Sequence, residues 1–172
     1  MAVKPIPDGY HAVTPYLVVK GAGKLIEFMT DVFGAEETFR MGGDTIMHAE
    51  VRLGDSMIML GDASEQNPPR PAMIHLYMPD ADAAYWKALA AGAKSIREPA
   101  DQFYGDRSAS VEDTFGNQWW IATHIEDVPP DEMERRAACA APAARHERLD
   151  GTGAQVFPVA GGRFPRRARR RA

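Results

Sequence analysis

A histidine and a carboxylate, side chains that can bind metal ions or ligands, lie two positions apart in residues 45–53. This segment alternates apolar with polar residues, which predicts a β-strand with two sets of side chains on opposite faces. His48 and Glu50 therefore share one face, and His75 joins them in a small His/Glu site if its strand is a neighbour. A hydrogen-bonded polar pair on the solvated side of the sheet is the alternative, which we favour over metal binding. The opposite face is expected to hold Met47, Ala49, Val51 and Leu53.

A second polar group, Tyr104, Asp106 and Arg107, lies in a predicted loop that leads into a hairpin. The planar guanidinium of Arg107 is suited to holding an anionic group through two parallel hydrogen bonds. The ring of Tyr104 is suited to stacking on a ligand or donating a hydrogen bond. The alternative is that Asp106 and Arg107 form a turn or an exposed ion pair of little energetic weight. The residue types leave both interpretations open.

The hairpin, residues 105–123, contains two adjacent tryptophans, Trp119 and Trp120. Its turn is predicted at residues 113–117, where aspartate opens the turn and glycine and asparagine tolerate a positive φ. Neighbouring side chains on a strand point to opposite faces. One tryptophan is therefore expected in the core and the other on the far face of the sheet, so this strand is covered on both sides.

The elements that position these residues occur in the same order twice. The first half is predicted to contain a strand, a helix and three strands at residues 11–19, 24–33, 36–41, 45–53 and 57–60. After a Pro-rich linker at residues 63–71, the second half repeats the order with a strand at residues 72–78, a helix after Asp80, a strand at residues 94–97 and the hairpin. Repetition at this period indicates two β-α-β-β-β modules.

Composition separates a folded domain from a basic tail. The 172-residue chain carries a net charge of −4, but residues 141–172 hold 8 Arg and 2 acidic residues, which leaves −10 for residues 1–140. The Arg-rich segment, residues 138–172, is expected to be disordered because it cannot bury enough apolar surface. Nucleic-acid binding by this tail is the less favoured alternative, since no aromatic-lined basic groove accompanies it. The single Cys139 and the absence of long apolar runs predict a cytoplasmic protein with no membrane partner.

Three segments together resemble the vicinal oxygen chelate superfamily, the glyoxalase, bleomycin-resistance and extradiol-dioxygenase group, and more closely its PhnB-like branch. They are TPYLVVKGAGKLIEFMTDVFGAEE, HAEVRLGDSMIMLGDA and FYGDRSASVEDTFGNQWWIATHIEDVPPDEMERR. The resemblance covers about residues 8–137, with module one at about 10–62, module two at about 72–124 and an extension at 125–137. It implies an α+β fold in which two βαβββ modules form a cupped eight-stranded mixed sheet with the helices outside. It also implies a homodimer.

Enzymes of this group place metal ligands, mostly His and Glu, on the first and last strands of each module. By register, the resemblance puts these positions on Thr14, Met59, Trp120, and either Met73 or His75. A methionine thioether suits soft ions, and tryptophan offers a metal no lone pair. At most one good ligand remains where at least three are needed. We therefore predict that the protein binds no metal and no other cofactor, and that Trp120 faces the cavity.

The leading functional hypothesis is a metal-free protein that binds a small molecule in an apolar and aromatic cavity, with a cationic ligand favoured by the acidic domain. The predicted ligand contacts are Thr14, His48, Glu50, Met59, His75, Tyr104, Arg107 and Trp120. One alternative is a lyase, isomerase or dioxygenase that uses one divalent metal ion at His48, Glu50 and His75. Another is an interaction module with a nucleic-acid-binding basic tail. The sequence assigns no catalytic residue.

Overall fold

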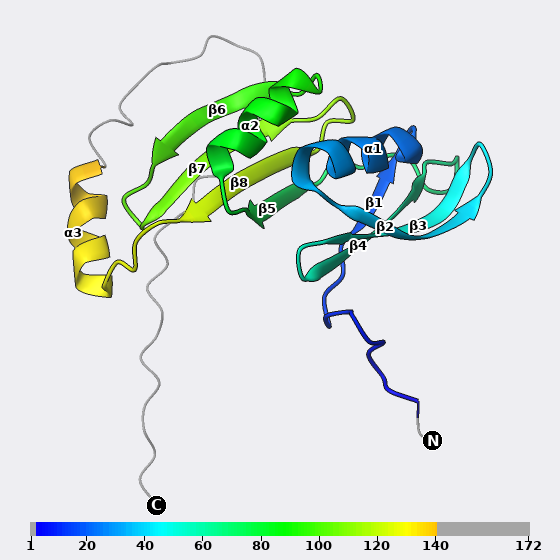
Figure 1. Cartoon of the computed structure of the whole chain (residues 1–172), viewed down its shortest axis with the longest axis horizontal. Helices are drawn as coiled ribbons and strands as arrows, with labels where there is room; N and C mark the ends of the chain where they lie inside the picture. Colours follow the sequence, from blue (N-terminus) through cyan, green and yellow to red (C-terminus); the bar gives the residue numbers. More distant parts are fainter. Residues whose placement is uncertain (1–2, 141–172) are drawn as a thin grey trace, which may run out of the picture. The chain divides into compact units, whose positions relative to one another are not determined.

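The structure is a computed structural model that describes residues 3–140 (Figure 1). Module one consists of β1 (Tyr16–Val19), α1 (Ala22–Phe33), β2 (Glu36–Gly42), β3 (Ile46–Leu53) and β4 (Ser56–Asp62). Module two consists of β5 (Met73–Tyr77), α2 (Ala81–Ala90), β6 (Lys94–Asp101), β7 (Asp106–Glu112) and β8 (Gln118–His124). A third helix, α3 (Pro130–Ala140), follows. The predicted double βαβββ order is therefore confirmed.

The eight strands form two mixed four-stranded sheets with the orders β1-β4-β3-β2 and β5-β8-β7-β6. In each module the first strand runs parallel to the last one, and the other pairs are antiparallel. The α+β class is confirmed, but the strands are divided between two sheets instead of one continuous sheet. Helix α1 lies over one face of the first sheet and α2 over one face of the second (Figure 1).

The core continues from one module into the other. Helix α1 buries an apolar stripe, Leu25, Ile26, Met29, Val32 and Phe33. It ends at Gly34, whose φ of 69° is the left-handed conformation that glycine adopts readily. The ring of Phe33 lies 4.9 Å from that of Trp119 in module two, centroid to centroid. Trp119 is fully buried, and its Nε1 donates to Asp113 Oδ2 at 2.9 Å, so it is the core tryptophan of the predicted pair.

Several strand limits differ from the predicted ones for local reasons. Strand β1 begins at Tyr16 instead of residue 11, after Pro15, which has no N–H to donate to a ladder. Met47 was expected among the buried residues of β3, but 68% of its surface is exposed, and Ile46 is buried instead. A register irregularity between β2 and β3, at Met41 and Gly42, interrupts the simple alternation there.

The segment after β8 is held on the start of β7 by backbone contacts. The carbonyl oxygen of Gly105 accepts hydrogen bonds from the N–H groups of Ile125 and Glu126, at 2.9 and 3.0 Å. Gly105 has a φ of 97°, and a Cβ placed on it would lie 2.1 Å from the carbonyl oxygen of Glu126. Helix α3, which the sequence analysis did not predict, includes the first three residues of the predicted tail. Residues 141–172, including the predicted disorder and basic patch, lie outside the described residues.

Candidate functional site

Each sheet turns one face to its helix and the other away from it, here called the helix-free face. Strand register aligns four residues across each helix-free face. Row one consists of Tyr16, Met59, Glu50 and Phe39. Row two consists of His75, Trp120, Ser110 and Arg97. The rows occupy equivalent places in the repeated modules, because each crosses the strands in the same order. Five of the eight predicted contacts lie on the two helix-free faces: Glu50 and Met59 in row one, with His48 beside them, and His75 and Trp120 in row two.

His48 and Glu50 form the polar pair that the sequence analysis favoured. His48 Nε2 lies 3.3 Å from Glu50 Oε1, and His48 Nδ1 lies 3.4 Å from the Tyr16 hydroxyl. The rings of Tyr16 and His48 also stack, with centroids 5.8 Å apart. A hydrogen bond with Glu50 raises the pKa of Tyr10 to about 12. The arrangement presents an aromatic surface bordered by a carboxylate.

A pocket of about 500 Å³ adjoins the two central residues of row one, Met59 and Glu50. Glu50 and Met59 form part of its wall. The N-terminal segment supplies the remaining residues, Pro5, Ile6, Pro7, Tyr10, His11, Ala12 and Thr14. The structure therefore unites the predicted contacts Thr14, Glu50 and Met59 in one pocket. The strand partner of Met59 is Tyr16, two residues beyond Thr14. Sequence reasoning missed Tyr16 because the start of β1 was placed too early.

Row two combines aromatic rings with polar atoms that have no partner. The guanidinium carbon of Arg97 lies 5.4 Å from the ring centroid of Trp120, a cation–π arrangement. His75 and Tyr77 meet edge to face with centroids 4.9 Å apart. Trp120 Nε1 and Ser110 Oγ are buried, and neither has a hydrogen-bond partner among the described residues. Sequence reasoning found His75 and Trp120 but missed Ser110 and Arg97, which only the strand register reveals.

The two predicted contacts Tyr104 and Arg107 lie apart from the rows. Arg107 donates from Nε to Asp82 Oδ2 at 2.7 Å and from Nη1 to Asp101 Oδ1 at 2.9 Å. These hydrogen bonds, the one to Asp82 first, raise the pKa of Arg107 above its usual value. The guanidinium is thus engaged with α2 and β6. Tyr104 lines a separate pocket of about 330 Å³ with His124 and residues of the C-terminal extension.

A hydrogen-bonded cluster that the sequence analysis did not assign joins β5, β7 and β8. Buried Asp106 accepts from the Tyr77 hydroxyl at 2.9 Å, and its other oxygen lies 2.8 Å from His124 Nδ1. His124 Nε2 lies 3.1 Å from Asp127 Oδ1. Hydrogen bonds with Asp106 and then Asp127 raise the pKa of His124. The predicted hairpin could have revealed the contact between Asp106 and His124, because these two residues are register partners at its open end.

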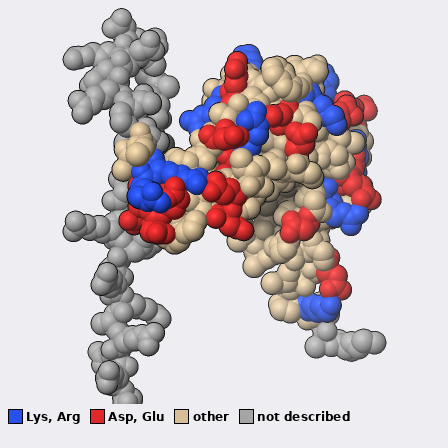
Figure 2. All heavy atoms as spheres, turned by 60° about the vertical axis from the view of Figure 1, so that its left-hand side comes forward, with Lys and Arg blue, Asp and Glu red and all other residues tan. Residues whose placement is uncertain are grey.

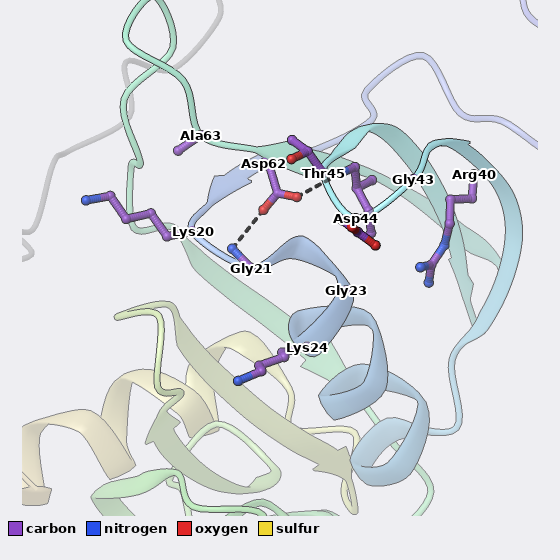
Figure 3. A pocket seen from close by; sticks show the side chains of 11 residues that line it. Lys20, Gly21, Gly23, Lys24, Arg40, Gly43, Asp44, Thr45, Asp62 and Ala63 are labelled. Atoms are coloured by element: carbon purple, nitrogen blue, oxygen red, sulfur yellow. Dashed lines mark hydrogen bonds between the residues drawn. The ribbon is translucent and has the colours of Figure 1, made fainter.

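A pocket of about 710 Å³ lies at the start of α1 and is bordered by Lys20, Lys24 and Arg40 (Figure 3). Asp62 accepts hydrogen bonds there from the backbone N–H groups of Gly21, Ala22 and Ile46, at 2.7–2.9 Å. Burial acts to raise the pKa of Asp62, but these three donors outweigh it and the pKa is lowered. Asp62 therefore caps the helix, since Gly21 offers no side chain to do so. Its carboxylate already uses the donors that an anionic ligand would need.

The described residues do not fit a metal centre within one chain. Within residues 3–140, no group of three or more His, Cys, Asp and Glu side chains converges on a metal position. His48 and Glu50 are neighbours, but His75 does not complete a three-ligand site with them. Met59 and Trp120 remain poor ligands at their positions. The expected absence of a metal stays a prediction, and so does the alternative of one divalent ion at His48, Glu50 and His75.

Two βαβββ modules, each with a helix on one sheet face, define the glyoxalase-like class of folds. The sequence profile of the Glyoxalase/Bleomycin resistance protein/Dioxygenase superfamily matches residues 10–121, and the chain belongs to that superfamily. An uncharacterized protein of Mycobacterium bovis is 34% identical over 136 residues, which cover 72% of this chain and 90% of that one. An uncharacterized protein of Mycobacterium tuberculosis H37Rv is also 34% identical over 136 residues, and the alignment covers 72% of this chain and 80% of that protein.

Solved structures share the fold at lower sequence identity. TioX from Micromonospora sp. ML1 is 22% identical with a TM-score of 0.58, covering 67% of this chain and 99% of TioX. TnmS3, described as an antibiotic binding protein from Streptomyces sp. CB03234, is 20% identical with a TM-score of 0.55, covering 72% of this chain and 98% of TnmS3. These likenesses show the fold of the chain. In the part of the chain that is described, no helix is long and apolar enough to cross a membrane.

Proposed function

We propose that this protein binds a small organic molecule on the helix-free faces of its sheets, without a metal ion. The observation that carries the proposal is the composition of the two rows. Half of the eight side chains are apolar or aromatic, Tyr16, Phe39, Met59 and Trp120, and the polar half, Glu50, His75, Ser110 and Arg97, is available to orient a ligand. Such a mixture is typical of small-molecule sites. The function is stoichiometric binding, with no bond formed or broken.

An antibiotic is the ligand class that the comparisons favour, since TnmS3 of the same fold is described as an antibiotic binding protein. We also propose membership in the PhnB-like branch, a cytoplasmic location and a homodimer. Large apolar side chains exposed on or beside the helix-free faces support the dimer: Val13, Tyr16, Phe39, Met41, Met47, Met73 and Tyr77. A second copy that covered them would enclose the ligand between the rows and give it a deeper cavity.

A thermal-shift screen of metal-stripped protein against a panel of aromatic and peptide antibiotics tests this function. We expect at least one compound to raise the melting temperature of the wild type and of Trp86→Ala. Trp86 is the matched control because it is exposed on α2, away from the helix-free face. The same compound should have little effect on Trp120→Ala. The proposal fails if no compound raises the melting temperature, or if every hit acts equally on Trp120→Ala.

A metal-dependent lyase, isomerase or dioxygenase is the second candidate, favoured by the His48–Glu50 pair with 3.3 Å between its nearest atoms. Its divalent ion would need a third ligand, for which His75 of a second copy is the candidate. The metal content of the purified protein tests this after incubation with Mn²⁺, Ni²⁺, Zn²⁺ and Fe²⁺ and removal of excess ion. One ion per chain, lost in His48→Ala, would support the enzyme. Absence of all four would remove this candidate.

Nucleic-acid binding remains the third prediction, and the tail on which it depends lies outside the described residues. On the face of the described chain that Figure 2 draws, Lys and Arg are interspersed with Asp and Glu. Deletion of residues 141–172 should abolish any salt-sensitive binding to nucleic acid. Unchanged binding after the deletion would contradict this role.

A further inference from the structure

Row two contains two buried polar atoms without hydrogen-bond partners, which lowers the stability of the free protein. Ser110 is fully buried, and neither its Oγ nor the neighbouring Trp120 Nε1 has a hydrogen-bond partner among the described residues. Ser110 and Trp120 are register partners on β7 and β8, so the two side chains lie side by side on one face. A buried polar atom without a partner costs about 1–3 kcal/mol. A ligand that supplies an acceptor there would recover this cost.

Arg97 borders the same place and is free to take part. It is the register partner of Ser110 on β6, its side chain is exposed, and its guanidinium lies over the Trp120 ring. No ion pair of Arg97 occurs within residues 3–140, whereas Arg107 on the adjoining strand has two. Arg97 can therefore rotate away from the ring without breaking an ionic contact. A planar ligand group that takes the place of the guanidinium on the Trp120 ring would lie beside the positively charged Arg97 side chain.

Three side chains of row two offer hydrogen-bond donors. Trp120 Nε1 only donates, Ser110 Oγ can donate, and the guanidinium of Arg97 offers a planar fork of donors. The aromatic face of Trp120 suits a flat ring. Row one holds a carboxylate, Glu50, at the position equivalent to Ser110. The two rows therefore differ in charge preference although they share one topology.

We propose that row two anchors an aromatic ligand through an anionic group, such as a carboxylate or sulfonate, attached to its ring system. The ring stacks on Trp120, and the anionic group accepts hydrogen bonds from Trp120 Nε1, Ser110 Oγ and the Arg97 guanidinium. This inference rests on the proposed function and names its ligand class. It departs from the cationic ligand that net charge favours, because local donors decide recognition at a site and the total charge of the domain does not.

A matched pair of fluorescent probes tests the anionic group. The probe 8-anilinonaphthalene-1-sulfonate carries a sulfonate, and N-phenyl-1-naphthylamine has the same aromatic body without it. We expect the wild type to bind the sulfonate about tenfold more tightly, the size of effect that one charge-assisted hydrogen bond produces. Arg97→Gln should remove most of this preference, measured as the ratio of the two dissociation constants within the same variant. Trp120→Phe, which keeps a ring but loses the N–H, should reduce the preference by a smaller factor.

Lys87→Gln is the matched control, since it removes one positive charge from the exposed side of α2 in the same module. It should keep the full preference for the sulfonate. Equal affinity for both probes, or an equal loss in Lys87→Gln and Arg97→Gln, would overturn the anionic anchor while leaving small-molecule binding intact. Failure of the wild type to bind either probe would contradict both the anchor and the proposed function.

Discussion

At the scale of single residues, the two neighbouring tryptophans show how one strand serves both the fold and the site. Trp119 is fully buried and packs on Phe33 of the other module, with its N–H bound to Asp113. Trp120 lies on the opposite face under Arg97 with an unpartnered N–H. The side-chain alternation of a strand assigns the two roles to adjacent positions.

Removal of each side chain should therefore have different consequences. We expect Trp119→Ala to lower the free energy of unfolding by about 3–5 kcal/mol, since it leaves a cavity between the modules. Trp120→Ala should cost less than about 2 kcal/mol, because it removes one cation–π contact and part of a surface. Urea denaturation of the two variants measures the difference. Equal losses would show that Trp120 is also a core residue.

Ser110→Ala should stabilise the free protein. Its hydroxyl is buried without a partner, so the substitution removes an uncompensated polar group while keeping the backbone pairing. We expect the free energy of unfolding to rise by about 1 kcal/mol. Thermal and urea unfolding, with the exposed Ser56→Ala as control, provide the measurement. A decrease for Ser110→Ala would mean that the hydroxyl has a stabilising partner in solution.

At the scale of elements, the C-terminal extension depends on a glycine that tolerates a close backbone approach. Gly105 has a positive φ, and a Cβ there would collide with Glu126. Gly105→Ala should therefore release residues 125–140, and limited proteolysis should cut this segment faster. Gly9→Ala is the control, because Gly9 also has a positive φ but no atom within 4 Å of the added Cβ. Equal protection of residues 125–140 in both variants would contradict this docking.

His124 adds a pH-dependent contact between the extension and module two. Hydrogen bonds with Asp106 and Asp127 raise its pKa above the usual value of about 6.5. A raised pKa in the folded state contributes stability that is complete below about pH 6.5 and is lost as the pH rises through the folded-state pKa. We expect the melting temperature of the wild type to fall over that range relative to His124→Gln. If the melting temperatures of the wild type and His124→Gln changed with pH in parallel, this would contradict the contact.

Sequence periodicity predicted the elements but not all of their registers. The alternation in β3 placed His48 with Glu50, and the helical stripe of α1 identified its buried residues. The predicted burial of Met47 was wrong because an irregularity between β2 and β3 changes the alternation there. Tyr16, Ser110 and Arg97 became visible only through pairing between strands far apart in the sequence. Such pairing depends on tertiary packing, which no local pattern encodes.

Helix α3 shows a second limit of the sequence. Five of its eleven residues are charged, and they form ion pairs such as the one between Arg136 and Glu126, at 2.7 Å. A short helix with a single large apolar side chain, Met133, gives a weak signal in sequence. The ion pair joins α3 to the segment before it, so this helix depends on a contact ten residues away.

At the scale of the whole molecule, the repeated module gives two equivalent rows with different chemistry. Row one pairs a carboxylate with tyrosine and phenylalanine, and row two pairs a guanidinium with tryptophan and histidine. A family scaffold is shared by many functions, so these side chains and not the fold decide what is bound. We propose that these side chains recognise a ligand without a metal ion.

The most direct measurement is the affinity of metal-stripped protein for the strongest compound from the antibiotic screen, with and without added Mn²⁺, Ni²⁺, Zn²⁺ or Fe²⁺. Fluorescence titration gives the affinity, and mass spectrometry of the recovered compound reports any turnover. We predict the same dissociation constant in every condition and an unaltered compound. Binding that appears only after a cation is added, or a compound that is chemically changed, would contradict this prediction.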